Sequence, residues 1–231
     1  MRNRIPAASL LCCLALWPAA PARADERAGV VLLPVRLRAL EAKIGSAAPV
    51  PVWARQLRAT MGLAFETLME QREDMRAVAM PELTDAQSLA LDENLRVVLT
   101  IIDTTQYFRS PPWKAQRTVL DRHFGDGLAF LADKAGARYA LLIDGVQVVQ
   151  ADWAGFMRHV VPGAVASTDA YVQLALLDLG TGEVVWSDGR DTGKMKGPTG
   201  RPLTDLRDTP TARELLRQLF ASYPRFPALT D

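Results

Sequence analysis

Two long apolar runs in the second half of the chain, one of them joined to a third run by a glycine-rich turn, restrict the fold more than any other feature. Residues 139–149 (YALLIDGVQVV) and 170–179 (AYVQLALLDL) are apolar at most positions and rich in Val, Leu and Ile. The tripeptide GTG at 180–182 then leads into residues 183–188 (EVVWSD). Strand-like runs on either side of such a turn predict a β-hairpin. The run 139–149 is apolar on both faces at its start, which predicts a strand inside a sheet.

Amphipathic helical patterns separate these runs from one another and from the chain ends. Residues 52–70 place apolar side chains at spacings of three and four, which predicts a helix with one buried face. Residues 84–87 (TDAQ) have the form of a capping box, so a second helix is expected to begin there. A third helix is expected within 113–135. A fourth is expected to open with Thr209 as N-cap and Pro210 in its first turn.

The remaining apolar segments complete the expected order of elements. Residues 29–37 (GVVLLPVRL) predict a buried first strand, in which Pro34 marks an edge, a bulge or the strand's end. Residues 42–51 predict a loop and 75–80 a second strand, whereas 97–102 (VVLTII) fits a strand or a continued helix. The order β, α, β, α, α, β, β, β, α predicts a single α/β (α+β) domain. It would hold a mixed, partly antiparallel sheet, with the hairpin in its C-terminal half and helices flanking it.

The amino terminus has the order of a cleavable secretory signal peptide over residues 1–24. Arg2 and Arg4 precede an apolar run of about a dozen residues, and the small-x-small triplet ARA at 22–24 follows. The run is shorter than the roughly 20 residues that span a bilayer, which disfavours a retained anchor. We therefore expect cleavage after Ala24 and a single exported domain over 25–231, periplasmic if the cell is a Gram-negative bacterium.

Both cysteines of the chain lie inside this expected signal peptide. A lipoprotein carrying its lipid on Cys12 or Cys13 is the alternative, but Leu10 and Leu11 stand where a lipobox has small residues. The exported chain is then expected to contain no disulfide, no thiol nucleophile and no Cys-ligated metal.

Composition and motif spacing argue against several classes of function. The chain has 27 Lys and Arg against 26 Asp and Glu, and removal of the three arginines in 1–24 leaves 24 against 26, so no basic surplus favours nucleic acid. His123 and His159 are far apart in sequence, so no metal or cofactor site is predicted. The glycine-rich stretch 189–207 lacks a phosphate-binding motif and predicts a flexible loop. Four carboxylates near strand ends or turns are candidates for turn formation first and for acid–base chemistry second: Asp144, Asp178, Asp188 and Asp191.

An amphipathic excursion over 152–167 separates the two long runs. Its bulky apolar residues fall at i, i+3, i+4, i+7 and i+8, which would place them on one side of a short helix. Such a stripe either covers one end of the sheet or docks a partner protein or a membrane surface. These candidate partner-binding residues are Trp153, Phe156, Met157, Val160 and Val161.

Two segments resemble a widespread pattern of bacterial envelope proteins. Residues 136–145 (GARYALLIDG) match a helix end followed by a strand, and residues 172–186 (VQLALLDLGTGEVVW) match a strand pair written Asp-x-x-Thr-Gly-x-Val-Val-Trp. With the opening strand, the chain over roughly 29–190 is similar to the α/β domain shared by the curli-secretion protein CsgG, the synthase activator LpoB and the amino-terminal domain of TolB. The resemblance implies envelope assembly or protein docking without an active site.

Three functions follow as hypotheses. The first is a non-enzymatic periplasmic envelope protein that acts by docking to another envelope protein or as an assembly accessory factor, with peripheral membrane contact as a possible addition. The second is a small periplasmic hydrolase that uses scattered Asp, Ser and His residues. The third is a small-ligand-binding protein with its pocket between the sheet and residues 84–112.

Overall fold

The computed structural model describes residues 27–43, 46–107, 122–150 and 170–223. Its elements follow one another in this order: β1 (Ala28–Leu32), β2 (Arg36–Lys43), β3 (Ser46–Pro49), α1 (Pro51–Glu70), β4 (Met75–Val78), α2 (Asp85–Tyr107), α3 (Ala129–Ala135), β5 (Tyr139–Gln150), β6 (Ala170–Asp178), β7 (Glu183–Asp191), the 3-10 turn η2 (Thr192–Lys194) and α5 (Thr209–Phe220).

The seven strands form one mixed sheet in which β5 lies inside, as its apolar sequence predicts. On one side β5 pairs antiparallel with β6, and β6 pairs antiparallel with β7 to form the predicted hairpin. On the other side β5 pairs parallel with two shorter strands placed end to end, first β1 and then β2. Beyond them, β4 pairs with β1 and β3 pairs with β2. The predicted α/β class with a mixed, partly antiparallel sheet is confirmed.

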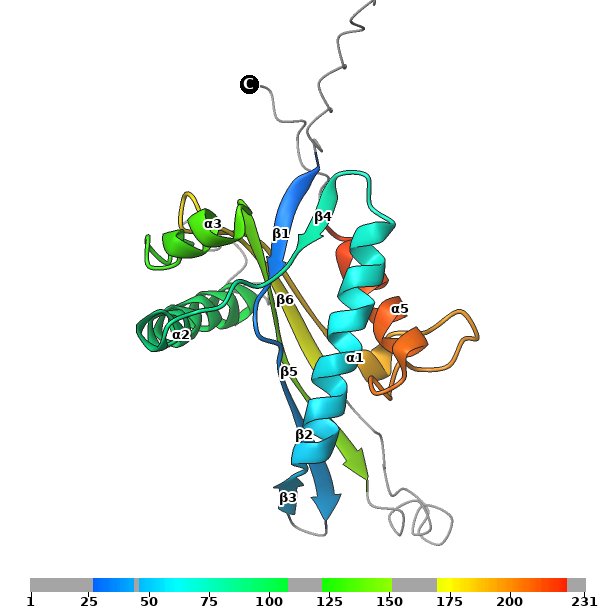
Figure 1. The fold of residues 1–231 in the computed structure, drawn as a ribbon. Coiled ribbons are helices and arrows are strands. Elements are labelled where there is room, and N and C mark those ends of the chain that lie inside the picture. Colours follow the sequence, from blue (N-terminus) through cyan, green and yellow to red (C-terminus); the bar gives the residue numbers. More distant parts are fainter. Residues whose placement is uncertain (1–26, 44–45, 108–121, 151–169, 224–231) are drawn as a thin grey trace, which may run out of the picture.

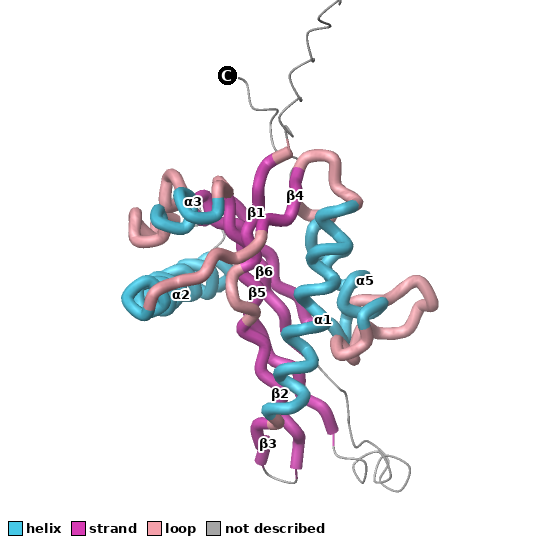
Figure 2. The backbone as a smooth tube through the Cα atoms, viewed as in Figure 1, coloured by secondary structure: helices cyan, strands magenta, loops and turns pink. Residues whose placement is uncertain are grey.

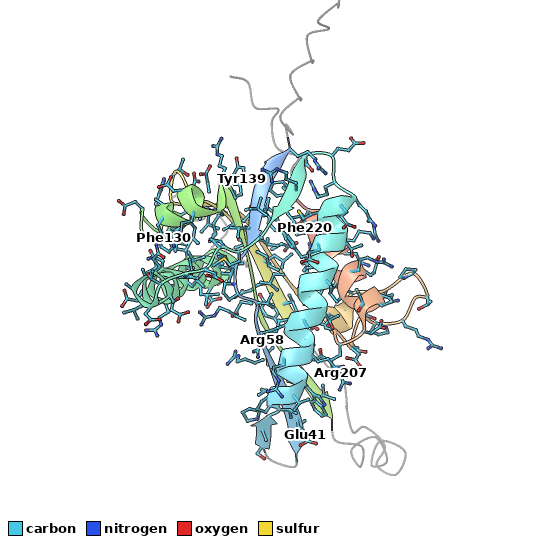
Figure 3. The ribbon with its side chains drawn as sticks, in the orientation of Figure 1. Glu41, Arg58, Phe130, Tyr139, Arg207 and Phe220 are labelled. Atoms are coloured by element: carbon cyan, nitrogen blue, oxygen red, sulfur yellow. The ribbon has the colours of Figure 1, made fainter. Side chains whose placement is uncertain are left out.

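Helices lie on both sides of the sheet and make three layers (Figures 1 and 2). α1 and α5 pack on one face, and α2 and α3 pack on the other, so that Phe220 of α5 and Phe130 of α3 lie on opposite sides of the sheet (Figure 3). Alternate residues of β5 enter the two core clusters: Leu141 and Ile143 face α1, whereas Ala140 and Leu142 face α2. This alternation follows from the two-residue period of a strand.

The ambiguous segment 97–102 is helical and belongs to α2. Its β-branched residues continue an apolar stripe in which Leu91, Leu95, Val98 and Ile102 are all buried against the sheet. The spacing of four, three and four is that of one helix face, and burial of this face outweighs the strand preference of the individual residues.

The expected strand 29–37 and the expected loop 42–51 are both wrong in their bounds. Pro34 lies in a break between β1 and β2. Both strands pair with β5, but the neighbour on the other side changes from β4 to β3 at this break, and β2 continues to Lys43. Within 42–51, residues Ser46–Pro49 form β3, which pairs with β2 at the edge of the sheet. An edge strand needs only one row of hydrogen bonds, so small residues and a terminal proline are tolerated in it.

Residues 122–128 before α3 are not helical, although the sequence predicts a helix within 113–135. His123 forms an isolated bridge with Glu183, and the backbone N–H of Phe124 donates to the carbonyl of Gly182 at 2.7 Å. Gly125 has a positive φ of 86°, which ends any helical continuation at that position. Residues 113–121 lie outside the described residues.

The connection 189–207, for which the sequence predicts a flexible loop, begins with the last residues of β7 and the turn η2 and packs on the core. β7 continues to Asp191, and the side chains of Leu203 and Leu206 are buried in the core on the α1 side. The buried amide of Gln147 holds this connection, because its Nε2 donates to the Thr204 carbonyl at 3.0 Å and its Oε1 accepts from the Leu206 N–H at 3.2 Å. A contact with a residue so distant in sequence cannot be predicted from the local composition of 189–207.

The helix starts agree with the sequence at one position and correct it at another. Thr84 and Gln87 form the predicted capping box, each side chain bonding the other residue's backbone N–H. The N-cap of α5 is Asp208, whose carboxylate accepts from the Thr211 N–H at 3.0 Å, and Thr209 is already the first helical residue. Pro210 occupies the first turn as predicted.

Candidate docking surface

One half of the α2-side face of the sheet carries apolar side chains that join neither core cluster. Figure 1 shows α1 running along the sheet on its own face, whereas α2 and α3 lie beside one end of the opposite face. Further along β5 on that opposite face, beyond the buried Leu142, lie Val146 and Val148, both half-buried. Leu40 pairs in register with Val148 and is half-buried, and Tyr171 pairs with Val146 and is 37% exposed. We call these four residues the open half-face.

The sheet register explains why these four side chains lie together. Arg38 of β2, Val146 of β5 and Tyr171 of β6 are cross-strand neighbours, and so are Leu40 and Val148 one step further along. Directly opposed residues on paired strands point to the same face of the sheet. Gly145 allows β5 and β6 to approach here, since a Cβ at this position would collide with the carbonyl oxygen of Tyr171. The open half-face is thus a continuous patch across three strands.

A polar cluster borders the open half-face on the side of α2. Gln173 donates from Nε2 to Asp144 Oδ2 at 3.3 Å, and Arg36 Nε lies 3.8 Å from Asp144 Oδ1. The same arginine lies 3.8 Å from Asp92 of α2, so it links the helix to the sheet. Burial raises the pKa of the Asp144 carboxyl, although Gln173 and the arginines act in the opposite direction. With the exposed Arg38, two guanidinium groups lie along this border.

The other three candidate carboxylates serve separate structural purposes. Asp178 is buried and accepts hydrogen bonds from the backbone N–H groups of Gly180 and Thr181 and from the guanidinium of Arg138. It therefore holds the hairpin turn, which is the turn-forming role that the sequence predicts for this carboxylate.

Asp188 lies on the α5 side of the sheet, opposite to Asp144. Its Oδ2 accepts from the Ser222 hydroxyl at 2.9 Å and from Arg190 Nη2 at 2.9 Å. Burial opposes its ionisation, yet these bonds and that of the Gly189 N–H hold the pKa of Asp188 below its ordinary value.

Asp191 caps η2 by accepting a hydrogen bond from the Gly193 N–H. The four carboxylates are not gathered into one site.

A histidine and a cavity are the remaining candidates for metal or ligand binding among the described residues. His123 is exposed, and within residues 27–43, 46–107, 122–150 and 170–223 no group of three or more His, Cys, Asp and Glu side chains is placed to hold a metal ion. A cavity of about 560 Å³ lies between α1 and β4, lined by Phe65, Met69 and Met80 among others. The pocket expected between the sheet and residues 84–112 involves residues outside the described ranges and stays a prediction.

The predicted partner-binding stripe, Trp153, Phe156, Met157, Val160 and Val161, lies outside the described residues. Its attachment points are described: β5 ends at Gln150 and β6 begins at Ala170, and Gln147 is paired with Ala170. The excursion therefore leaves and re-enters the sheet at the end where the open half-face lies.

Sequence reasoning did not find the open half-face or its polar border. Arg36, Asp144 and Gln173 are far apart in sequence, and only strand register brings them together. One local signal points to the site: Gln173 is a polar residue between Val172 and Leu174 in an otherwise apolar strand. A buried amide needs hydrogen-bond partners, which marks such a position as part of a polar cluster.

Among the described residues, no helix combines the length and the apolar character that crossing a membrane requires. No family model matches this chain, and no curated protein matches it.

The chain is similar to several solved structures at low identity. The LpoB C-terminal domain from Salmonella enterica has 14% identity and a TM-score of 0.27 over 71% of this chain and 81% of that one. The PelC dodecamer from Paraburkholderia phytofirmans has 13% identity and a TM-score of 0.35 over 86% and 92%. Lipoprotein GNA1162 from Neisseria meningitidis has 10% identity and a TM-score of 0.32 over 71% and 81%. The expected likeness to LpoB is thus found, whereas the comparisons do not support the likeness to CsgG or TolB. Such low values describe a distant likeness and assign no activity, partner or assembly state to this chain.

Proposed function

We propose that this chain is an exported, non-enzymatic protein of the bacterial envelope that acts by docking to another envelope protein. Export is supported by the order of charged, apolar and small residues over 1–24. Docking is supported by the open half-face, because partly exposed apolar groups gathered on one part of a sheet are typical of interaction sites.

The observation that carries the proposal is the position of Tyr171 and Val146 beside Arg38. Tyr171 on β6 is 37% exposed and borders Val146 of β5, and the exposed Arg38 lies on the other side of Val146, on β2. Aromatic residues and arginine are enriched among the residues that contribute most to protein–protein binding. The partner expected here is a protein surface with an apolar centre and carboxylates at its rim.

The stripe from Trp153 to Val161 enters the proposal as a second contributor. The excursion connects β5 to β6 at this end of the sheet, and we therefore propose that its apolar residues bind the same partner. Replacement of Trp153 and Phe156 by Ser separates its two expected roles. A lowered melting temperature identifies a core role, whereas an unchanged melting temperature with reduced partner cross-linking identifies a docking role.

The proposal is tested by site-specific photo-cross-linking in living cells. A photoreactive amino acid at position 171 is expected to give a discrete cross-linked product, which the additional variant Arg38→Glu weakens. Leu89 on α2 is 61% exposed and serves as the matched control position for the cross-linker, and Arg96→Glu on the same helix is the matched charge reversal. Equal products from positions 171 and 89, or no product from 171, would contradict docking through the open half-face.

A further inference from the structure

The outward face of α1 is complementary in charge to a reversed copy of itself. Its amino-terminal half carries the exposed Arg55 and its carboxyl-terminal half carries the exposed Glu66. Between and beside them stand apolar side chains that face solvent, with Val52 61% exposed and Leu63 56% exposed. We propose that two copies of this chain associate through α1, packed antiparallel about a two-fold axis that passes between Thr60 and Met61.

The register of this pair follows from the helix geometry. An axis midway between Thr60 and Met61 places Arg55 of each copy opposite Glu66 of the other, which makes two symmetry-related ion pairs. The two residues lie about 20° apart on the helical wheel, on the same strip of α1 as Ala59 and Gly62. In a two-fold antiparallel pair this strip of each helix faces the same strip of the other, so both ion pairs form together.

The same axis brings small residues to the point where the helices cross. It places Ala59 of each copy opposite Gly62 of the other. Small residues at the crossing let two helices approach until their axes are about 8 Å apart, the short end of the usual range of interaxial distances. α1 has 20 residues and is therefore about 30 Å long, enough for several turns of contact on either side of the axis.

Gly62 is the observation within the chain that favours a close neighbour on this face. Glycine in the middle of a helix weakens the helix relative to alanine. Among the described residues, a Cβ at Gly62 would meet no atom within 4 Å, so packing inside the chain does not call for a glycine. A second helix passing over Ala59 and Gly62 does call for one. This surface is separate from the open half-face, since α1 lies on the other side of the sheet (Figure 1).

Sedimentation equilibrium of the exported chain tests the proposal through charge reversal. Arg55→Glu and Glu66→Arg each turn two attractive pairs into two repulsive ones and are expected to weaken dimerisation about tenfold. The double variant restores opposite charges and is expected to return the dissociation constant to within about threefold of the wild type. Arg96→Glu on α2 is the matched control and leaves the dissociation constant unchanged.

Variants at the crossing point provide a second readout that does not depend on charge. Gly62→Leu places a bulky side chain between the helices and is expected to give a monomer with a melting temperature no lower than that of the wild type, whereas Gly62→Ala adds only a methyl group and is expected to weaken the dimer less. A wild-type chain that is monomeric at every concentration tested overturns the proposal. So does a dimer whose dissociation constant is the same in the Arg55 and Glu66 single variants as in the wild type.

Discussion

The indole of Trp186 and the ring of Phe220 lie with their centroids 5.4 Å apart, which fastens the outer strand of the hairpin to the last helix. Tyr223 meets Trp186 edge-on at 5.5 Å, and the Arg72 guanidinium lies 5.7 Å from the Phe220 centroid. Trp186 is only 7% exposed in this cluster. The aromatic cluster thus connects β7, α5 and the end of α1.

Replacing Trp186 by Ala is expected to lower the free energy of unfolding by about 3–5 kcal/mol, because a large aromatic is removed from a packed site. Urea denaturation measures the change. Trp186→Phe keeps a ring against Phe220 and should lose clearly less. A loss below about 1 kcal/mol for Trp186→Ala, the size expected at a surface position, would contradict the anchoring role.

Gly182→Ala is expected to be more destabilising than Gly200→Ala, although both residues have positive φ values, 69° and 75°. At Gly200 a Cβ meets nothing within 4 Å, so only the backbone cost of about 1–2 kcal/mol applies. At Gly182 the new Cβ also collides with the carbonyl oxygen of Gly125. The hydrogen bond from the Phe124 N–H to the Gly182 carbonyl keeps this segment close to the turn. Thermal unfolding of the two variants measures the difference in stability. Equal losses of stability would show that the residues before α3 shift to make room for the new Cβ.

Local signals predicted the hairpin and the start of α2, whereas the contacts that strand register sets could not be predicted from the sequence. The turn at 180–182 is marked by its glycines, and the buried positions of α2 keep a helical spacing through the β-branched run 97–102. By contrast, Arg36 reaches Asp144 only because β2 follows β1 along the same side of β5. No local pattern encodes this end-to-end placement, so the polar border and the open half-face emerge only in three dimensions.

Asp188 is expected to contribute stability at neutral pH that is lost in acid. Its pKa in the folded chain lies below the ordinary value of 3.8, so between these two values the unfolded chain binds more protons. The contribution is therefore full above about pH 3.8 and disappears as the pH falls through the folded-state pKa. Asp188→Asn should lower the free energy of unfolding by about 1–3 kcal/mol at pH 7 and by clearly less in acid.

The measurement is urea denaturation of wild type and Asp188→Asn over a series of pH values. Ser222→Ala removes one donor to the carboxylate and keeps the charge, so it should give a smaller loss with the same direction of pH dependence. A difference between wild type and Asp188→Asn that is constant from neutral to acid pH would show that the lost stability comes from packing instead of ionisation.

Asp208 and Thr209 stand next to each other at the start of α5, and both are residue types that favour the N-cap position. Sequence favours Thr209, but the carboxylate of Asp208 accepts from the N–H and the hydroxyl of Thr211 at 3.0 and 2.7 Å. Asp208→Ala is expected to cost about 0.5–2 kcal/mol, since it leaves a first-turn N–H without its acceptor. Thr209→Ala, one residue inside the helix, should change stability by less than about 0.5 kcal/mol. Chemical denaturation of the two variants measures both losses of stability. The reverse order of losses would move the N-cap to Thr209 and lengthen the connection that Gln147 holds by one residue.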